Sequence, residues 1–216
     1  MLSYKNNNYT LIQGELLRKF IHFSSAFIPI GYLYSDKNLV LSILIPILVF
    51  MLLFEFAKYF SKPLFEFYYK LFGNLLRNHE FDRHRIRITG ASWLLLSDII
   101  CIILFPKLIA VTGMLILSLA DSLSALIGRH FAKKHFAPNR SYLGTATFFI
   151  VSVIIVTVTP KYLYLPLEYI IGIAAVLVTT IADSINIPID DNFTIPIVTS
   201  GLLYLLYIIF LPGIFI

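Results

Sequence analysis

Seven apolar segments, separated by short polar stretches, make up most of this 216-residue chain. Hydrophobic residues account for 58% of the sequence and charged residues for only 13%, whereas soluble domains carry about 25% charged residues. Because about 20 apolar residues suffice for one helix to cross a bilayer, the sequence predicts an all-α, polytopic integral membrane protein with about seven transmembrane helices. The expected spans cover roughly residues 16–34, 39–60, 90–105, 108–127, 143–159, 167–183 and 194–211.

The polar stretches define the expected domain organisation. Residues 1–14 are rich in asparagine and predict a flexible polar tail, and residues 15–216 predict a single transmembrane catalytic domain. The one cysteine, Cys101, lies in an apolar segment, which excludes a disulfide framework and a cysteine metal site. No motif indicates binding of nucleic acid. The three longer polar stretches, expected to be cytoplasmic loops, are residues 61–89, 128–142 and 184–193.

Lysine and arginine are distributed unevenly between the polar stretches. Cytoplasmic loops of membrane proteins carry an excess of these residues. With the N-terminus placed in the cytoplasm, 14 of the 17 basic residues lie on the cytoplasmic side, and only Lys37, Lys107 and Lys161 lie on the other. We therefore expect a cytoplasmic N-terminus and an active site on the cytoplasmic face, in the inner membrane of a bacterium or an ER-type membrane of a eukaryote.

The first cluster of ionisable residues opens the first apolar segment. Glu15, Arg18, Lys19 and His22 follow one another at helical spacing and share one face of a helix, with His22 about 10 Å deeper than Glu15. An anchor of basic side chains that snorkel to the membrane surface would explain Arg18 and Lys19. It would not explain Glu15 or His22, and ionisable groups inside a membrane usually serve function.

The second cluster surrounds Asp121 in the apolar sequence LADSLSALIGR. One interpretation is a close helix contact of small residues, with the carboxylate hydrogen-bonded inside the bundle. However, a carboxylate at this depth is costly unless it binds a cation or pairs with a base. Mg²⁺ held by one or two carboxylates together with nucleotide phosphates satisfies that requirement.

Two further clusters precede the fifth and the last spans. In the sequence NRSYLG, Arg140, Ser141 and the backbone N–H groups of a helix start favour an anion, although a simple helix cap is the rival interpretation. In the sequence ADSINIPIDDNFT, Asp190, Asp191 and Asn192 indicate a second metal or nucleotide-contacting loop, with Asp183 lying back towards the membrane. The rival there is a solvated turn in which Asp191 or Asn192 caps the final helix.

The order of these motifs resembles the CTP-dependent lipid kinases, a family that includes dolichol kinase, phytol kinase and the fungal-type diacylglycerol kinase. This family is distantly similar to phosphatidate cytidylyltransferases. The resemblance extends from Glu15 to about Leu206 and implies transfer of the γ-phosphate of CTP to a lipid alcohol such as a polyprenol, phytol or diacylglycerol. The segments that carry it are ELLRKFIH, RITGASWLLLSDIICIILFP, LADSLSALIGRHF, NRSYLG and DDNFTIPIVTSGLLYLL.

The resemblance also carries over individual roles. It places the functional arginine–lysine pair of the family on Arg18 and Lys19, its aspartate and glycine on Asp121 and Gly128, and its acidic loop on 190–192. The chain departs from the family pattern at Ala120, where a glycine usually precedes the aspartate, and at Leu143, where an acid is expected.

The residues and the resemblance together define the expected site. Either Asp121 or His22 is expected to take the proton from the lipid hydroxyl. Mg²⁺ or another divalent ion is the expected cofactor, and CTP is the expected phosphoryl donor. A phosphatidate cytidylyltransferase is one alternative, and a non-catalytic lipid transporter or scaffold is another, although the clustering of polar residues at one face favours an enzyme. The expected catalytic residues are Asp121, Arg18, Lys19 and His22; the nucleotide- and phosphate-binding residues are Gly128, Arg129, Arg140, Ser141, Gly144 and Asn192; and the metal ligands are Asp121, Asp190 and Asp191.

Overall fold

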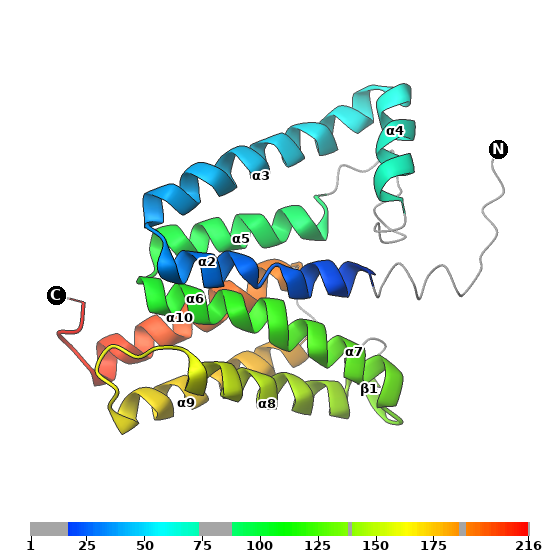
Figure 1. Ribbon diagram of the computed structural model, residues 1–216. Helices are drawn as coiled ribbons and strands as arrows, with labels where there is room; N and C mark the ends of the chain where they lie inside the picture. The colour runs from blue at the N-terminus through cyan, green and yellow to red at the C-terminus, as the bar shows by residue number, and fades with distance from the viewer. Residues whose placement is uncertain (1–16, 74–87, 138–139, 186–188, 216) are drawn as a thin grey trace.

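The computed structural model describes residues 17–73, 88–137, 140–185 and 189–215, which form a bundle of helices with one two-stranded hairpin (Figure 1). Residues 17–24 are helical and are followed by α2 (Phe27–Tyr34), α3 (Lys37–Phe60), α4 (Lys62–Phe72), α5 (Gly90–Leu104), α6 (Lys107–Leu115), the π-helix η2 (Ile116–Asp121) and α7 (Ser122–Phe131). The antiparallel strands β1 (His135–Ala137) and β2 (Arg140–Ser141) lead into α8 (Tyr142–Val158), α9 (Pro166–Ser184) and α10 (Asp191–Phe210).

Each expected span corresponds to helical structure, in agreement with an all-α membrane protein. Among the residues that the structure describes, four helices are long and apolar enough to cross a membrane, and they cover Lys37–Phe60, Lys107–Phe131, Pro166–Ser184 and Asp191–Phe210. Two further apolar helices, α5 and α8, are shorter. The count of seven spans and the cytoplasmic N-terminus stay predictions.

The distribution of side chains is that of a protein solvated by lipid. Large apolar residues point outward, with Phe27 78% and Phe60 83% exposed, whereas Ser97, Asp98 and Thr199 are almost completely buried. An outer surface of this kind would be costly in water and is favourable in hydrocarbon.

Two of the expected loops contain regular structure. Within 61–89, α3 ends and α4 begins at Ser61, whose backbone is extended, and the proline at position 63 lies in the first turn of α4. In Figure 1, α4 runs crosswise to α3. Within 128–142, α7 continues to Phe131 and the hairpin of β1 and β2 follows. The assignment of both stretches to the cytoplasmic side stays a prediction.

Candidate functional site

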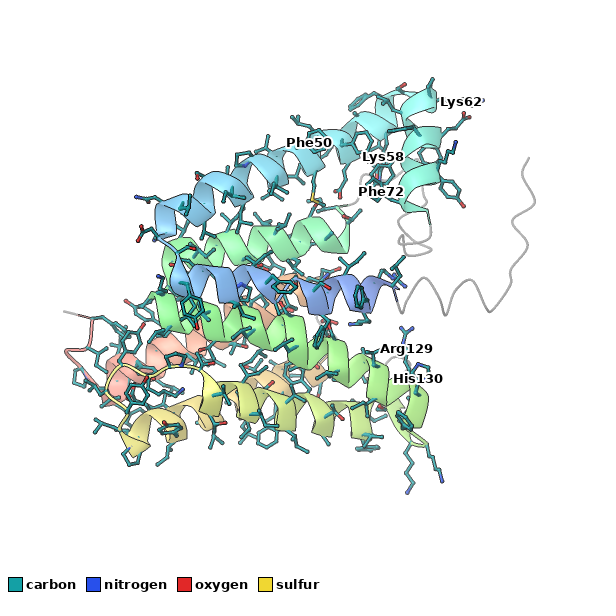
Figure 2. All side chains as sticks on the ribbon, in the orientation of Figure 1. Phe50, Lys58, Lys62, Phe72, Arg129 and His130 are labelled. Carbon is teal, nitrogen blue, oxygen red and sulfur yellow. The ribbon has the colours of Figure 1, made fainter. Side chains whose placement is uncertain are left out.

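Charged side chains from five segments gather at one end of the bundle. The segments are helical residues 17–24, the end of η2, strand β2, the end of α9 and the start of α10. In Figure 1 the end of α7 and the start of α8 lie at this end, and the C-terminal residues lie at the other. Figure 2 shows that Lys58, Lys62 and Arg129 also lie at the end that carries the cluster.

The first helical segment turns its charged face inward. Lys19 Nζ lies 2.6 Å from Asp121 Oδ2, and the two side chains are only 15% and 14% exposed. Phe20 on the same segment is 68% exposed and faces the surroundings of the bundle. A snorkelling anchor would direct the lysine outward to the membrane surface, so the ion pair favours the functional interpretation of Lys19.

A π-helix positions the carboxylate of Asp121. The wider turn of η2 ends at this residue, and π-helical turns inside α-helices are frequent at functional sites. Opposite η2, the first helix is interrupted at residues 25–26, and the Ser25 hydroxyl lies 2.9 Å from that of Ser118. His22 lies close enough to Asp121 for the two charges to interact. The two irregular turns therefore face each other and bring His22, Lys19 and Asp121 together.

Arg140 bridges two carboxylates that lie far apart in the sequence. Its guanidinium donates to Asp183 Oδ2 at the end of α9 and to Asp191 Oδ2, 3.1 Å away, in the first turn of α10. Burial by itself would lower the pKa of Arg140, but the charges of Asp183, Asp191 and Asp121 outweigh this effect and raise that pKa. The guanidinium therefore stays charged and holds three chain segments together.

One carboxylate oxygen of the cluster lacks a hydrogen-bond donor among the described residues. Asp121, Asp183 and Asp191 face Lys19 and Arg140 in these ion pairs. Within the described part of the chain, Asp183 Oδ1 is buried and accepts no hydrogen bond. A buried carboxylate oxygen without a donor is costly, so the arrangement is suited to an added cation or proton donor.

The sequence places Asp183 back towards the membrane but does not single it out as a site residue, although like Asp121 it is an acid within an apolar segment or at its end. The predicted metal ligands are Asp121, Asp190 and Asp191. Asp190 is the N-cap of α10, where its carboxylate accepts the Asn192 N–H at 3.0 Å. The rival interpretation, in which Asp191 or Asn192 caps the final helix, is therefore wrong in the capping residue.

Three residues assigned to phosphate are accounted for by packing between α7 and α8. The Ser141 hydroxyl caps α8 by accepting the Gly144 N–H at 3.0 Å and is buried. A Cβ atom on Gly128 would lie 2.8 Å from this hydroxyl oxygen and 3.2 Å from the Gly144 Cα atom. The rival interpretation of a helix cap thus applies to Ser141, and both glycines are needed because the two helices touch there.

Asn192 is likewise engaged within the bundle. Its side-chain amide nitrogen donates to the Gly90 carbonyl at 2.9 Å, and its backbone carbonyl accepts the Ser97 hydroxyl at 2.8 Å. Asn192 is only 4% exposed and joins α10 to α5.

Two basic residues of the expected site lie near the cluster. Arg18 is half-buried on the inward-facing segment beside Lys19, and Arg129 is exposed in the last turn of α7. Glu15 and Asn139 lie outside the described residues.

The carboxylates of the cluster are ligands of the kind that Mg²⁺ prefers. No group of three or more His, Cys, Asp or Glu side chains is placed to hold a metal among the residues described. Mg²⁺, however, is commonly bound by one or two carboxylates, with phosphate oxygens and water completing its shell. Asp183 and Asp191 are two such carboxylates, and both are bound to the guanidinium of Arg140. Asp183 Oδ1 accepts no hydrogen bond within the described part of the chain and could bind the ion.

Two proteins are similar in sequence to the chain over most of its length. CTP-dependent diacylglycerol kinase 1 of Saccharomyces cerevisiae is 28% identical over 217 residues, covering 88% of this chain and 72% of the yeast protein. An uncharacterised protein of Rickettsia prowazekii is 26% identical over 185 residues, covering 85% of this chain and 90% of that protein. No family model and no solved structure matches the chain. The distant similarity to the yeast enzyme supports the family resemblance drawn from the motifs.

Proposed function

We propose that this protein is a CTP-dependent lipid kinase that transfers the γ-phosphate of CTP to the hydroxyl group of a membrane-embedded lipid alcohol. The observation that carries the proposal is the guanidinium of Arg140, bound by Asp183 and Asp191 and close enough to Asp121 for their charges to interact, at one end of an apolar bundle. The similarity to the yeast diacylglycerol kinase supports the nucleotide and the class of acceptor.

Phosphoryl transfer depends mainly on positioning and on stabilising negative charge. Lys19 and Arg140 lie in the cluster, and Arg18 and Arg129 at the same end of the bundle would add positive charge for the phosphate chain. In this scheme Arg140 keeps its forked contact to Asp183 and Asp191 and thereby orients both carboxylates. Ser141, Gly128 and Gly144 support the site through the packing of α7 on α8 and do not contact phosphate.

The carboxylates have two separate tasks. Asp183 and Asp191 would hold Mg²⁺, which when bound would offset the charge on the β- and γ-phosphates. Asp121 or the neighbouring His22 would accept the proton of the lipid hydroxyl as its oxygen attacks the γ-phosphorus and CDP leaves. Lys19 at 2.6 Å would hold the Asp121 carboxylate in place for this step.

The test uses the purified full-length chain in lipid vesicles with CTP labelled at either the α- or the γ-phosphate, and with polyprenol, diacylglycerol or phosphatidate as acceptor. Label from the γ-position on a lipid alcohol is the expected result. Label from the α-position on phosphatidate would make the protein a cytidylyltransferase and overturn the proposal. Absence of transfer from both positions would favour the transporter or scaffold alternative.

A matched pair of variants ties the activity to the cluster. Asp183→Asn keeps the size of the side chain but removes its charge, and we expect it to raise the Mg²⁺ concentration needed for half-maximal activity at least 10-fold. Asp36→Asn, at the N-cap position of α3, serves as the control and is expected to leave that concentration unchanged. Equal Mg²⁺ dependence of both variants would exclude Asp183 from the metal site.

A further inference from the structure

A groove with a volume of about 520 Å³ lies between α8 and α9 and is bordered by the β1 strand. Its walls are mainly apolar and aromatic, formed by Phe136, Tyr142, Phe149 and Leu177. Pockets that hold most of a small ligand have volumes of about 300–1,000 Å³. The groove is therefore large enough for a substantial part of a lipid molecule.

The groove opens on the lipid-facing side of the bundle. Tyr142 is 63% exposed and Leu177 is 51% exposed, although both line its walls. Since α9 is one of the helices long enough to span a membrane, a molecule can enter this groove sideways from the hydrocarbon without crossing water. An apolar chain is the occupant that such walls favour.

Two residues that line the groove are near neighbours in sequence of residues in the charged cluster. Ser184, which lines the groove, directly follows Asp183, and Tyr142, which forms another wall, stands two positions after Arg140. Hydroxyl groups are found among the lining residues, including Thr145 and Ser184. The Ser184 hydroxyl already donates to the Thr180 carbonyl at 2.9 Å, so its oxygen is left to accept a hydrogen bond from an incoming hydroxyl group.

We propose that this groove between α8 and α9 is the acceptor site, in which the apolar chain of the lipid alcohol lies along Phe149 and Leu177 and its hydroxyl group reaches Ser184 beside Asp183. The proposal rests on the kinase function proposed above and adds the place and direction of acceptor binding. In the reverse orientation the hydroxyl group would lie beside Phe149 and Leu177, whose side chains offer no hydrogen-bond partner.

The experiment separates binding from phosphoryl transfer. The full-length protein in phosphatidylcholine vesicles is irradiated, without CTP, with diacylglycerol or polyprenol that carries a photoreactive diazirine in its apolar chain, and the labelled peptides are identified by mass spectrometry. We expect labelling of residues in 142–149 and 177–184 that is competed by an excess of the unmodified alcohol. Labelling by only one of the two probes would identify the acceptor class.

Substitution within the groove provides the second measurement. Ala146 lines the groove, and Ala146→Trp would fill it; Ala174 is exposed on α9 but does not line the groove, so Ala174→Trp is the matched control. We expect Ala146→Trp to reduce competed labelling and to raise KM for the lipid alcohol at least 10-fold while KM for CTP stays unchanged. Ala174→Trp is expected to behave as the unaltered protein in both assays.

The outcomes distinguish the two proposals. Competed labelling of the groove without phosphoryl transfer would support binding of the lipid alcohol in the groove and overturn the kinase function, and with it the role of acceptor. Phosphoryl transfer with an unchanged KM for the alcohol in Ala146→Trp would support the kinase function and overturn the proposal that the groove is the acceptor site. Labelling spread evenly over the surface of the bundle and not competed by the unmodified alcohol would show ordinary contact with bulk lipid, and would also overturn the groove.

Discussion

Lys19 Nζ lies 2.6 Å from Asp121 Oδ2, although 102 positions separate the two residues in the chain. Both side chains are largely buried, so each offsets the cost of placing the other in apolar surroundings. The pair therefore fixes the first helical segment against the π-helix and also defines the position of the proposed base. This double task makes it the first target for mutagenesis.

We expect Lys19→Met and Asp121→Asn each to reduce kcat at least 100-fold, because positioned charges near the reacting phosphate contribute about that much to phosphoryl transfer. Leaving one buried charge without its partner is also expected to lower stability by about 3 kcal/mol. The double variant Lys19→Met/Asp121→Asn removes both charges, so its thermal unfolding temperature should recover towards that of the unaltered protein while its activity stays low. Recovery of activity together with stability would mean that the pair is purely structural.

Arg140 should not be replaceable by lysine. Its planar guanidinium contacts Asp183 and Asp191 through two different nitrogen atoms, a geometry that a single ammonium group does not reproduce. We expect Arg140→Lys to lower kcat/KM for CTP about 100-fold, measured with the γ-labelled nucleotide. Lys134→Ala, an exposed change in the turn before β1, keeps the hairpin and should leave kcat/KM within about twofold. Equal activity of Arg140→Lys and the unaltered protein would show that charge alone is sufficient.

The helical segments of the expected spans could be predicted from hydropathy, because each long apolar run folds as helix. Helix α4, the short hairpin, the break at residues 25–26 and the π-helix could not. The direction of the charged face on the first segment could not be predicted, since an outward anchor and an inward site give the same helical spacing. Lys19 is assigned to the inward site only by its contact with Asp121.

The contacts between the residues of the site could not be predicted from the sequence either. Asp183 and Asp191 meet at Arg140 from positions 43 and 51 residues away, and no local pattern specifies such a meeting. Conversely, Ser141 and Asn192 have side chains that suit both a ligand and a helix end. Only their burial and their hydrogen bonds assign them to the scaffold.

The contact between α7 and α8 predicts an interaction between two substitutions. Gly128→Ala would place a Cβ atom 2.8 Å from the Ser141 hydroxyl oxygen, and such overpacking costs about 1–3 kcal/mol. Ser141→Ala removes that oxygen and, as the loss of a helix cap, costs about 1 kcal/mol. We therefore expect Gly128→Ala to be less destabilising in the Ser141→Ala background than in the unaltered protein, as measured by thermal unfolding in detergent. Additive losses would show that the backbone of Gly144, and not the hydroxyl, limits the approach of the helices.

Glu168 at the opposite end of the bundle allows stability to be changed without touching the site. Its carboxylate is completely buried and accepts the backbone N–H groups of Tyr162, Leu163 and Leu165 at 2.9–3.0 Å, together with the Tyr207 hydroxyl at 3.0 Å. In Glu168→Gln the amide nitrogen would face at least one of these donors, so the loss should approach the cost of a buried unsatisfied group, about 1–3 kcal/mol.

Tyr207→Phe removes only one donor to Glu168 and is expected to cost about 1 kcal/mol. Because both residues lie far from the cluster around Arg140, KM for CTP and KM for the lipid alcohol should stay unchanged in both variants below their unfolding temperatures. A change in either KM would mean that the far end of α9 is coupled to Asp183, which lies in the last turn of the same helix. The order of the unfolding temperatures, with Glu168→Gln lowest, therefore tests the stabilising role of the hydrogen bonds to Glu168 independently of any catalytic assignment.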